Sequence, residues 1–243
     1  MPVVDTEQNL NSSVRRTWEA LKTLSRKILH DTNNVYGAIQ GYLSLLDMAG
    51  TRDKQLARYL SAMQEALDTG MTRNKALAAF YREQQVMVIA IEPLETARKA
   101  AAGSAAGLEI QPSVTADTDL PPLQVEEPAF QDLIDLLCFL AQQTGSVEPD
   151  ISLMQAELDA AQIAAMVMES NPGAYLQISM TIDTAGLNGD MTGFLQPYRM
   201  SVDPEADLGV GRLLPILANH NGNLDLIQDN GGLQLNMYFP YPA

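Results

Sequence analysis

Apolar residues recur at a spacing of about 3.5 residues near the start of the chain, which is the spacing of one packed face of a helix. The pattern predicts a helix from Asn11 to Met48, with residues 1–10 frayed. The predicted apolar stripe is interrupted by two small hydroxyl residues and comprises Val14, Trp18, Leu21, Ser25, Ile28, Thr32, Val35, Ile39, Tyr42 and Leu46. A stripe of this length indicates that the helix lies in a bundle.

A second long helix is predicted from Asp53 to Glu83, because Gly50, Thr51 and Arg52 interrupt the first pattern. Its expected core positions are Leu56, Leu60, Met63, Leu67, Leu77 and Tyr81. Two long helices joined by so short a turn pack antiparallel. One hairpin cannot bury its apolar seam alone, so we expect two copies to form a homodimeric four-helix bundle.

After residue 85 the pattern becomes mixed. Strands are predicted at 86–91, 108–114, Ile151–Leu158, Met166–Met168 and Ala174–Ile182, helices at Pro93–Ala102, Ala129–Gln143 and Gly209–Asn219, and a closing hairpin at 223–228 and 233–239. The expected fold class is therefore α + α/β. A helical-hairpin domain occupies residues 1–84, and an α/β domain with helices against one face of a mixed sheet occupies residues 85–243.

Charge separates the same two halves. Residues 1–84 hold 11 Lys and Arg against 9 Asp and Glu, a net charge of +2, whereas residues 85–243 hold 4 against 21, a net charge of −17. Binding to a nucleic-acid backbone requires several cations, which the second half lacks. We expect no nucleic-acid partner.

The single cysteine, Cys138, excludes an internal disulfide and fits a reducing compartment. Its apolar neighbours indicate a buried thiol rather than a reactive one. No apolar run approaches a membrane span, and the N-terminus has no basic segment followed by an apolar one. We therefore expect a cytoplasmic protein without a membrane partner. No Cys and His cluster has the spacing of a zinc site, so no metal is expected.

His30 is the residue on which candidate chemistry centres. At about 100° per residue it points away from the stripe that contains Ile28, toward solvent or a partner. The same outward face carries two cations, an amide and three small residues, namely Arg26, Lys27, Asn34, Gly37, Ala38 and Gly41. Each glycine inside a helix is about 1 kcal/mol less favourable than alanine, which suggests that a close approach of a partner compensates.

The segment HDTNN, followed by IQGYLSLL, resembles the phosphoacceptor helix of bacterial two-component histidine kinases. In the second half, GAYLQISMTIDTAG, FLQPY, LGVGRLLPILANHNGNLDLI and LQLNMYFP are similar, in order, to segments of the ATP-binding domain of that family. The resemblance covers nearly the whole chain. It implies a dimerisation and phosphotransfer hairpin followed by a histidine-kinase ATPase domain.

The second half departs from this family at the positions that would bind a nucleotide. Leu136 or Leu140 stands where the family has an asparagine that holds Mg²⁺, which prefers oxygen ligands. Ile182 replaces the aspartate of the first glycine box in one alignment; in the other, Asp183 is present but the glycines become Ala185 and Leu187. Gly209 and Gly211 remain, yet the preceding loop carries Asp203, Glu205 and Asp207, which repel a triphosphate. The resemblance therefore implies a degenerate ATPase domain.

These observations predict a histidine phosphotransferase that relays phosphoryl groups between response-regulator receiver domains through a phosphohistidine at His30, without ATP. Asp31 would orient the ring or accept its second proton, Asn34 would position a water molecule or bind the partner, and Arg26 and Lys27 would offset phosphoryl charge. Gly37, Ala38 and Gly41 would admit a receiver helix. No cofactor is expected on this chain; any Mg²⁺ would come from the receiver, and a hybrid histidine kinase is a further potential partner.

Two other functions and several simpler explanations remain open. The chain could be a divergent ATP-dependent histidine kinase, or a pseudokinase scaffold that only binds partners. An exposed histidine on a helix is most often an ordinary surface residue, and the two glycines could simply permit close packing inside the bundle. The other histidine, His220, is interpreted as a turn residue.

Overall fold

A computed structural model describes residues 4–49, 54–81, 87–117, 119–183, 213–228 and 232–242. They divide into two compact units, which are considered separately. One unit is the helical hairpin Glu19–Gln84, and the other combines Met1–Trp18 with Gln85–Ala243. The first turns of α1 therefore belong with the α/β unit. In this division the hairpin is inserted between two segments of the α/β unit, whereas the sequence pattern predicts residues 1–84 as one preceding domain.

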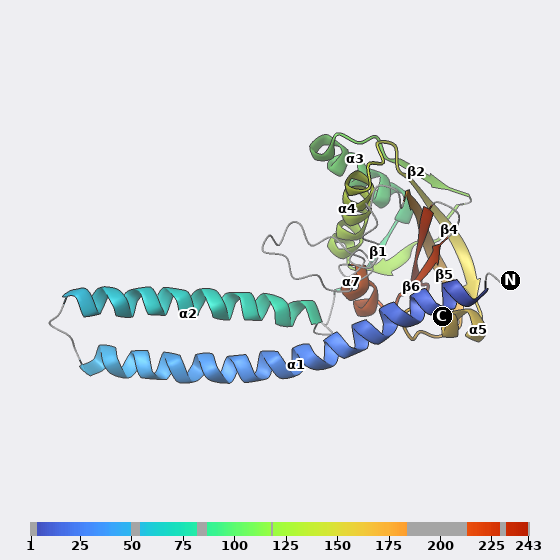
Figure 1. Ribbon diagram of the computed structural model, residues 1–243. Helices are drawn as coiled ribbons and strands as arrows, with labels where there is room; N and C mark the ends of the chain where they lie inside the picture. The colour runs from blue at the N-terminus through green and yellow to red at the C-terminus, as the bar shows by residue number, and fades with distance from the viewer. Residues whose placement is uncertain are drawn as a thin grey trace. The chain divides into compact units, whose positions relative to one another are not determined.

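Helix α1 spans Val4–Ala49 and α2 spans Lys54–Tyr81, and they run in opposite directions (Figure 1). The long hairpin is thus confirmed, although fraying up to residue 10 is wrong from Val4 onward. Neither glycine nor proline interrupts residues 4–36, and two acidic residues near the start, Asp5 and Glu7, favour the positive end of the helix dipole. Of the helices in the described ranges, none is long and apolar enough to cross a membrane.

The contact between the two hairpin helices differs from the predicted one. Leu29, Leu43 and Leu67 are buried, and Tyr36 lies against Gly70. By contrast, five residues of the predicted stripe are exposed, namely Ile28, Val35, Ile39, Tyr42 and Leu46. The apolar arc of α1 is wider than a single neighbouring helix can cover, so α2 covers only one edge of it.

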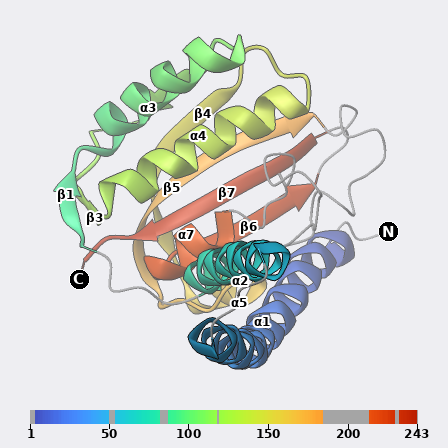
Figure 2. The same ribbon diagram turned by 90° about the vertical axis from the view of Figure 1, so that its left-hand side faces the viewer.

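The α/β unit is built on a five-stranded mixed sheet in the order β2-β4-β5-β7-β6 (Figure 2). Its strands are β2 (Ser113–Ala116), β4 (Asp150–Leu158), β5 (Gly173–Asp183), β6 (Asn223–Gln228) and β7 (Gly232–Pro240). Strand β2 pairs parallel with β4, and the other pairs are antiparallel. The predicted mixed sheet and its closing hairpin are confirmed.

Three helices cover one face of this sheet: α3 (Pro93–Leu108), α4 (Glu127–Gln143) and α7 (Leu213–Asn219) (Figures 1 and 2). Alternate residues of β5 and β7 point to these helices, since Ile178 pairs with Met237 and both are fully buried. Phe130 of α4 meets Phe239 of β7 with ring centroids 5.8 Å apart. This layer is the core of the unit.

Several elements of the α/β unit differ from the sequence prediction. Helix α3 extends six residues beyond Ala102, through residues 103–108, and ends at Glu109, whose backbone is left-handed. As a result, the strand predicted at 108–114 begins only at Ser113. The strand predicted at 86–91 reduces to β1 (Ile89–Ile91), which pairs with β3 (Leu123–Val125), an element too short to predict.

The segment Met166–Met168 is not the predicted strand. It follows the short helix α5 (Ala160–Ala165), which was not predicted and is opened by a capping box between Asp159 and Gln162. Its described backbone contact with β6 is a single hydrogen bond of 2.9 Å, which the N–H group of Val167 donates to the carbonyl oxygen of Leu224. Its apolar residues are buried as a turn against the sheet edge.

Candidate functional site

His30 lies in the middle of α1 and its side chain is 74% exposed. The outward direction predicted from helical phase is therefore confirmed. Its neighbour Leu29 is buried, whereas Ile28, on the far side of the helix, belongs to the exposed part of the apolar arc. The imidazole thus stands on a polar ridge that is separate from both apolar surfaces of α1, and a large partner can reach it.

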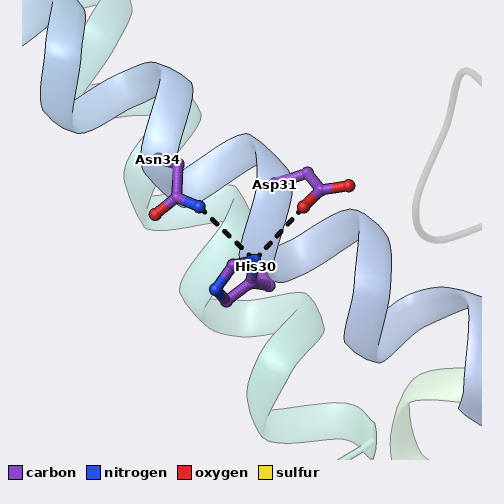
Figure 3. Close-up of polar contacts among 3 residues, drawn as sticks. All are labelled: His30, Asp31 and Asn34. Carbon is purple, nitrogen blue, oxygen red and sulfur yellow. Dashed lines mark hydrogen bonds and ion pairs between the residues drawn. The ribbon is translucent and has the colours of Figure 1, made fainter.

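Asp31 and Asn34 both approach the same ring nitrogen of His30 (Figure 3). The distance from His30 Nδ1 is 3.2 Å to Asp31 Oδ1 and 3.4 Å to Asn34 Nδ2. The other ring nitrogen, Nε2, points away from both side chains (Figure 3). The structure therefore brings together the three residues predicted as catalytic and leaves Nε2 accessible.

The two contacts select opposite tautomers of His30. If Nδ1 carries the proton, it donates to the Asp31 carboxylate and Nε2 keeps a free lone pair. If Nδ1 is unprotonated, it accepts from the Asn34 amide and Nε2 carries the proton. A carboxylate is the stronger partner for an N–H group, so Asp31 favours the tautomer in which Nε2 is the nucleophile. Because Asp31 is 63% exposed, this preference is worth less than about 1 kcal/mol.

The small residues beyond His30 face open space. A Cβ atom added to Gly37 or Gly41 would meet nothing within 4 Å, and Ala38 is exposed. Gly70 on α2 is different, because a Cβ there would lie 2.8 Å from Tyr36 Oη. Packing within the hairpin therefore explains Gly70 but neither Gly37 nor Gly41. Contact with a second molecule, the role predicted for those two glycines, stays a prediction.

Arg26 and Lys27 lie on α1 one turn before His30, but their side chains are outside the described part of the structure. Their interaction with a phosphoryl group stays a prediction.

Three candidate positions of the family's nucleotide site are apolar in the described part of the α/β unit, whereas a fourth, Asp183 at the end of β5, is an exposed carboxylate. Leu136 and Leu140 are buried in α4, and Ile182 is fully buried in β5. None of these side chains offers an oxygen to a metal ion or a polar group to an adenine. The remaining positions of the glycine boxes lie outside the described residues, namely Ala185, Gly186, Leu187, Asp203, Glu205, Asp207, Gly209 and Gly211.

A hollow of about 470 Å³ opens where β5 ends. Among described residues it is lined by Thr144, Gly145, Ser146, Thr181, Ile182, Asp183 and Gly232. Asp183 is the only charged residue in that lining, and its carboxylate disfavours an anionic ligand such as a triphosphate.

His220 has a structural role that sequence reasoning missed. It is 8% exposed, and its Nδ1 lies 2.8 Å from the carbonyl oxygen of Ile216. Its Nε2 accepts a hydrogen bond of 3.1 Å from the backbone N–H of Glu126, just before α4, and its ring packs on Phe239. The residue joins α7, the start of α4 and β7. The segment PILANHNG gave no sign of this, because the donor, the backbone N–H of Glu126, lies 94 residues away in the chain.

Cys138 is a buried thiol, as predicted. Burial, followed by the charge of Asp135, raises its pKa to about 11, so it stays protonated at neutral pH. No group of three or more His, Cys, Asp or Glu side chains that could hold a metal ion occurs in the part of the chain that the structure describes.

No model of a known protein family matches the chain. Among solved structures it is similar to full-length ShkA in complex with AMPPNP, with a TM-score of 0.48, 14% identity, and coverage of 91% of this chain and 46% of that one. It is also similar to histidine kinase ThkA in complex with response regulator protein TrrA, with a TM-score of 0.47, 13% identity and coverage of 100% and 68%. For the Acinetobacter baumannii histidine kinase AdeS the TM-score is 0.41 and the identity 12%, with coverage of 88% and 98%.

ThkA and AdeS are described as histidine kinases. The chain spans slightly under half the length of ShkA.

Proposed function

We propose that the protein is a homodimeric histidine phosphotransferase that relays phosphoryl groups between response-regulator receiver domains through a phosphohistidine at His30, and does so without ATP in the cytoplasm. The observation that carries this proposal is the combination of a 74% exposed imidazole with two polar neighbours that both engage Nδ1. An ordinary surface histidine needs no such arrangement.

The chemistry follows from the free nitrogen. The Nε2 lone pair of His30 attacks the phosphorus of an aspartyl phosphate in line, a nitrogen–phosphorus bond forms, and the phosphorus–oxygen bond to the aspartate breaks. The aspartate leaves as a carboxylate. The positive charge that develops on the ring is offset by Asp31, to which Nδ1 donates. Attack by the aspartate of a second receiver reverses these steps, with Mg²⁺ held by the receiver.

The second half of the chain favours receiver domains, rather than ATP, as the source of the phosphoryl group. Leu136 or Leu140 occupies the position of the family's Mg²⁺-binding asparagine, and Ile182 occupies that of the aspartate in one of the two alignments; all three side chains are buried and apolar. An acidic unit with few cations also disfavours a triphosphate. Incubation with labelled ATP and Mg²⁺ is expected to leave the protein unlabelled, and labelling would instead favour the divergent kinase.

Two copies are expected to pair through the apolar surface that α2 leaves open. On α1 this surface comprises Ile28, Val35, Ile39, Tyr42 and Leu46, and α2 exposes Tyr59 and Met63. Burying one such side chain contributes about 1.5–3 kcal/mol, so covering this surface supplies enough free energy for a stable dimer. His30 lies on the other side of α1, so a four-helix bundle formed this way leaves the imidazole accessible.

The test is transfer from a phosphorylated receiver domain. The protein is mixed with a labelled receiver, separated from it, and examined for label that is lost in acid and retained in alkali. Wild type is expected to acquire such label and His30→Ala is not. Equal labelling of both proteins would contradict the role of His30. If neither protein acquires label and His30→Ala keeps the biological output of wild type, the result favours a pseudokinase scaffold.

A further inference from the structure

The two polar neighbours of His30 bind the same ring nitrogen in opposite directions. Asp31 Oδ1 lies 3.2 Å from Nδ1 and, as a carboxylate oxygen, accepts a hydrogen bond. Asn34 Nδ2 lies 3.4 Å from the same Nδ1 and, as an amide nitrogen, donates one. The first bond needs a proton on Nδ1 and the second needs a free lone pair there, so the two bonds exclude each other.

Both side chains are committed to this ring. Asp31 and Asn34 reach Nδ1 from different sides, while Nε2 points away from them (Figure 3). In the part of the chain that the structure describes, neither side chain has a hydrogen-bond partner other than His30. The protonation state of Nδ1 therefore decides which of the two neighbours is bound, and each neighbour in turn favours one protonation state.

The state of Nδ1 also decides how easily a phosphoryl group leaves Nε2. When the nitrogen–phosphorus bond breaks, its electron pair returns to Nε2. A ring that carries a proton on Nδ1 leaves as neutral imidazole, whereas a ring without that proton leaves as an imidazolate anion, which is a much poorer leaving group. Release to water, or to the carboxylate of a receiver, therefore proceeds from the ring that is protonated on Nδ1.

We propose that Asn34 is a positioning residue that prolongs the lifetime of the phosphohistidine, because it donates to an unprotonated Nδ1 and holds the ring in the form that keeps its phosphoryl group. Asp31 has the opposite effect, since it favours the protonated ring from which the group departs. This inference rests on the proposed function, which places a phosphoryl group on Nε2 of His30. It gives Asn34 the role of retaining the phosphoryl group, not that of positioning a water molecule for hydrolysis.

The size of the effect is limited by solvent. His30, Asp31 and Asn34 are all exposed, so water competes for both contacts and each is expected to change the rate of release by about two- to fivefold. Other charges near the ring do not enter a comparison of variants. Arg26 and Lys27, and the residues of α2 from 73 onward, whose side chains lie outside the described part of the structure, stay the same in every variant.

The test begins with chemical phosphorylation of the full chain. Phosphoramidate transfers its phosphoryl group to an imidazole and releases ammonia, so no receiver domain is needed. Loss of the phosphoryl group is then measured across a range of pH for wild type, Asn34→Ala and Asp31→Ala, with His30→Ala to subtract phosphorylation elsewhere. At neutral pH the loss is expected to be about two- to fivefold faster in Asn34→Ala and about two- to fivefold slower in Asp31→Ala.

The pH profile separates this role from a merely structural one. The rate of loss rises as the pH falls, and its midpoint is expected to move to higher pH in Asn34→Ala and to lower pH in Asp31→Ala. Asn34→Asp keeps the size of the side chain but replaces the donor by an acceptor, so it is expected to lose the group faster than Asn34→Ala. Ser44→Ala removes an exposed hydroxyl that donates to the carbonyl oxygen of Gln40, and as the matched control it is expected to behave as wild type.

Three results would overturn the role of Asn34: loss from Asn34→Ala at the wild-type rate, slower loss, as a water-positioning residue requires, or loss from Asn34→Asp no faster than from Asn34→Ala. Nuclear magnetic resonance of the unphosphorylated, neutral His30 ring gives a measurement that involves no phosphotransfer. The fraction of rings with the proton on Nδ1 is expected to rise in Asn34→Ala and fall in Asp31→Ala, and unchanged fractions would contradict the inference. If the chemically phosphorylated wild type passes no phosphoryl group to a receiver domain, the proposed function fails, while the rates of loss and the ring fractions still decide the role of Asn34.

Discussion

Three helical glycines of the hairpin differ only in what surrounds them, and alanine substitution separates their roles. Gly37→Ala and Gly41→Ala each add a methyl group into open space, since nothing lies within 4 Å of either Cβ position. Alanine is about 0.8–1 kcal/mol more favourable than glycine inside a helix. Each substitution is therefore expected to raise the free energy of unfolding by about 1 kcal/mol, and the pair by about 2 kcal/mol.

Gly70→Ala has the same helix propensity but a different outcome. Its Cβ would lie 2.8 Å from Tyr36 Oη and 2.9 Å from Cζ, so the ring has to move. Overpacking of this kind costs about 1–3 kcal/mol, which cancels or exceeds the gain in propensity. In a Tyr36→Ala background the obstruction is absent, and Gly70→Ala is expected to stabilise the hairpin like the other two substitutions.

The assay is urea unfolding of the full chain, followed by circular dichroism of the helices, at one protein concentration because the proposed dimerisation would couple to stability. Stabilisation by Gly70→Ala equal to that by Gly37→Ala would refute this account of the hairpin contact. The functional counterpart is Gly37→Leu. It is expected to slow transfer from a receiver while leaving dimerisation intact, with Gly37→Ala as control, and unaltered transfer rates would show that the small residues do not admit a partner.

Three further predictions concern residues outside this strip. Asn223→Ala is expected to lower the free energy of unfolding by about 2–4 kcal/mol, because it leaves buried backbone groups of Met168 without partners. Denaturant titration measures this loss, and a loss below about 1 kcal/mol would contradict the prediction. Cys138 has a pKa raised from 9.0 to about 11 in the folded state, so its contribution to stability is complete below pH 9 and is lost as the pH rises toward 11. Between pH 9 and 11, Cys138→Ala is therefore expected to lose less of its free energy of unfolding than wild type does. Equal losses in the two proteins would contradict this prediction. Tyr42→Glu places a charge in the exposed apolar surface of α1 and is expected to prevent formation of the proposed dimer, as measured by light scattering. Thr23→Glu, on the outward face, is expected to leave that dimer intact.

The residues of the candidate site could be found from sequence because they lie on one helix. Helical phase alone places His30 outward and puts Asp31 and Asn34 within reach of it. The same reasoning failed for the packing of α1, where Leu29 and Leu43 rather than Ile28 and Val35 are buried, because an apolar arc does not reveal which of its edges a neighbour covers.

Interactions between residues far apart in sequence were not accessible in this way. The bonds from Asn11 to β6 join residues more than 200 positions apart, and His220 is held by backbone groups of α7 and α4. Neither leaves a periodic signal. The short elements β3 and α5 were missed because three to six residues carry too little pattern to separate them from a loop.

The most direct measurement of the central claim is nuclear magnetic resonance of the histidine-labelled protein after exposure to a phosphorylated receiver domain, with no ATP present. We predict that one imidazole becomes phosphorylated on Nε2 and that the signals of His220 do not change. The signal of the phosphorylated imidazole is expected to be missing in His30→Ala. Phosphorylation at Nδ1, at another residue, or only after ATP is supplied would contradict this prediction.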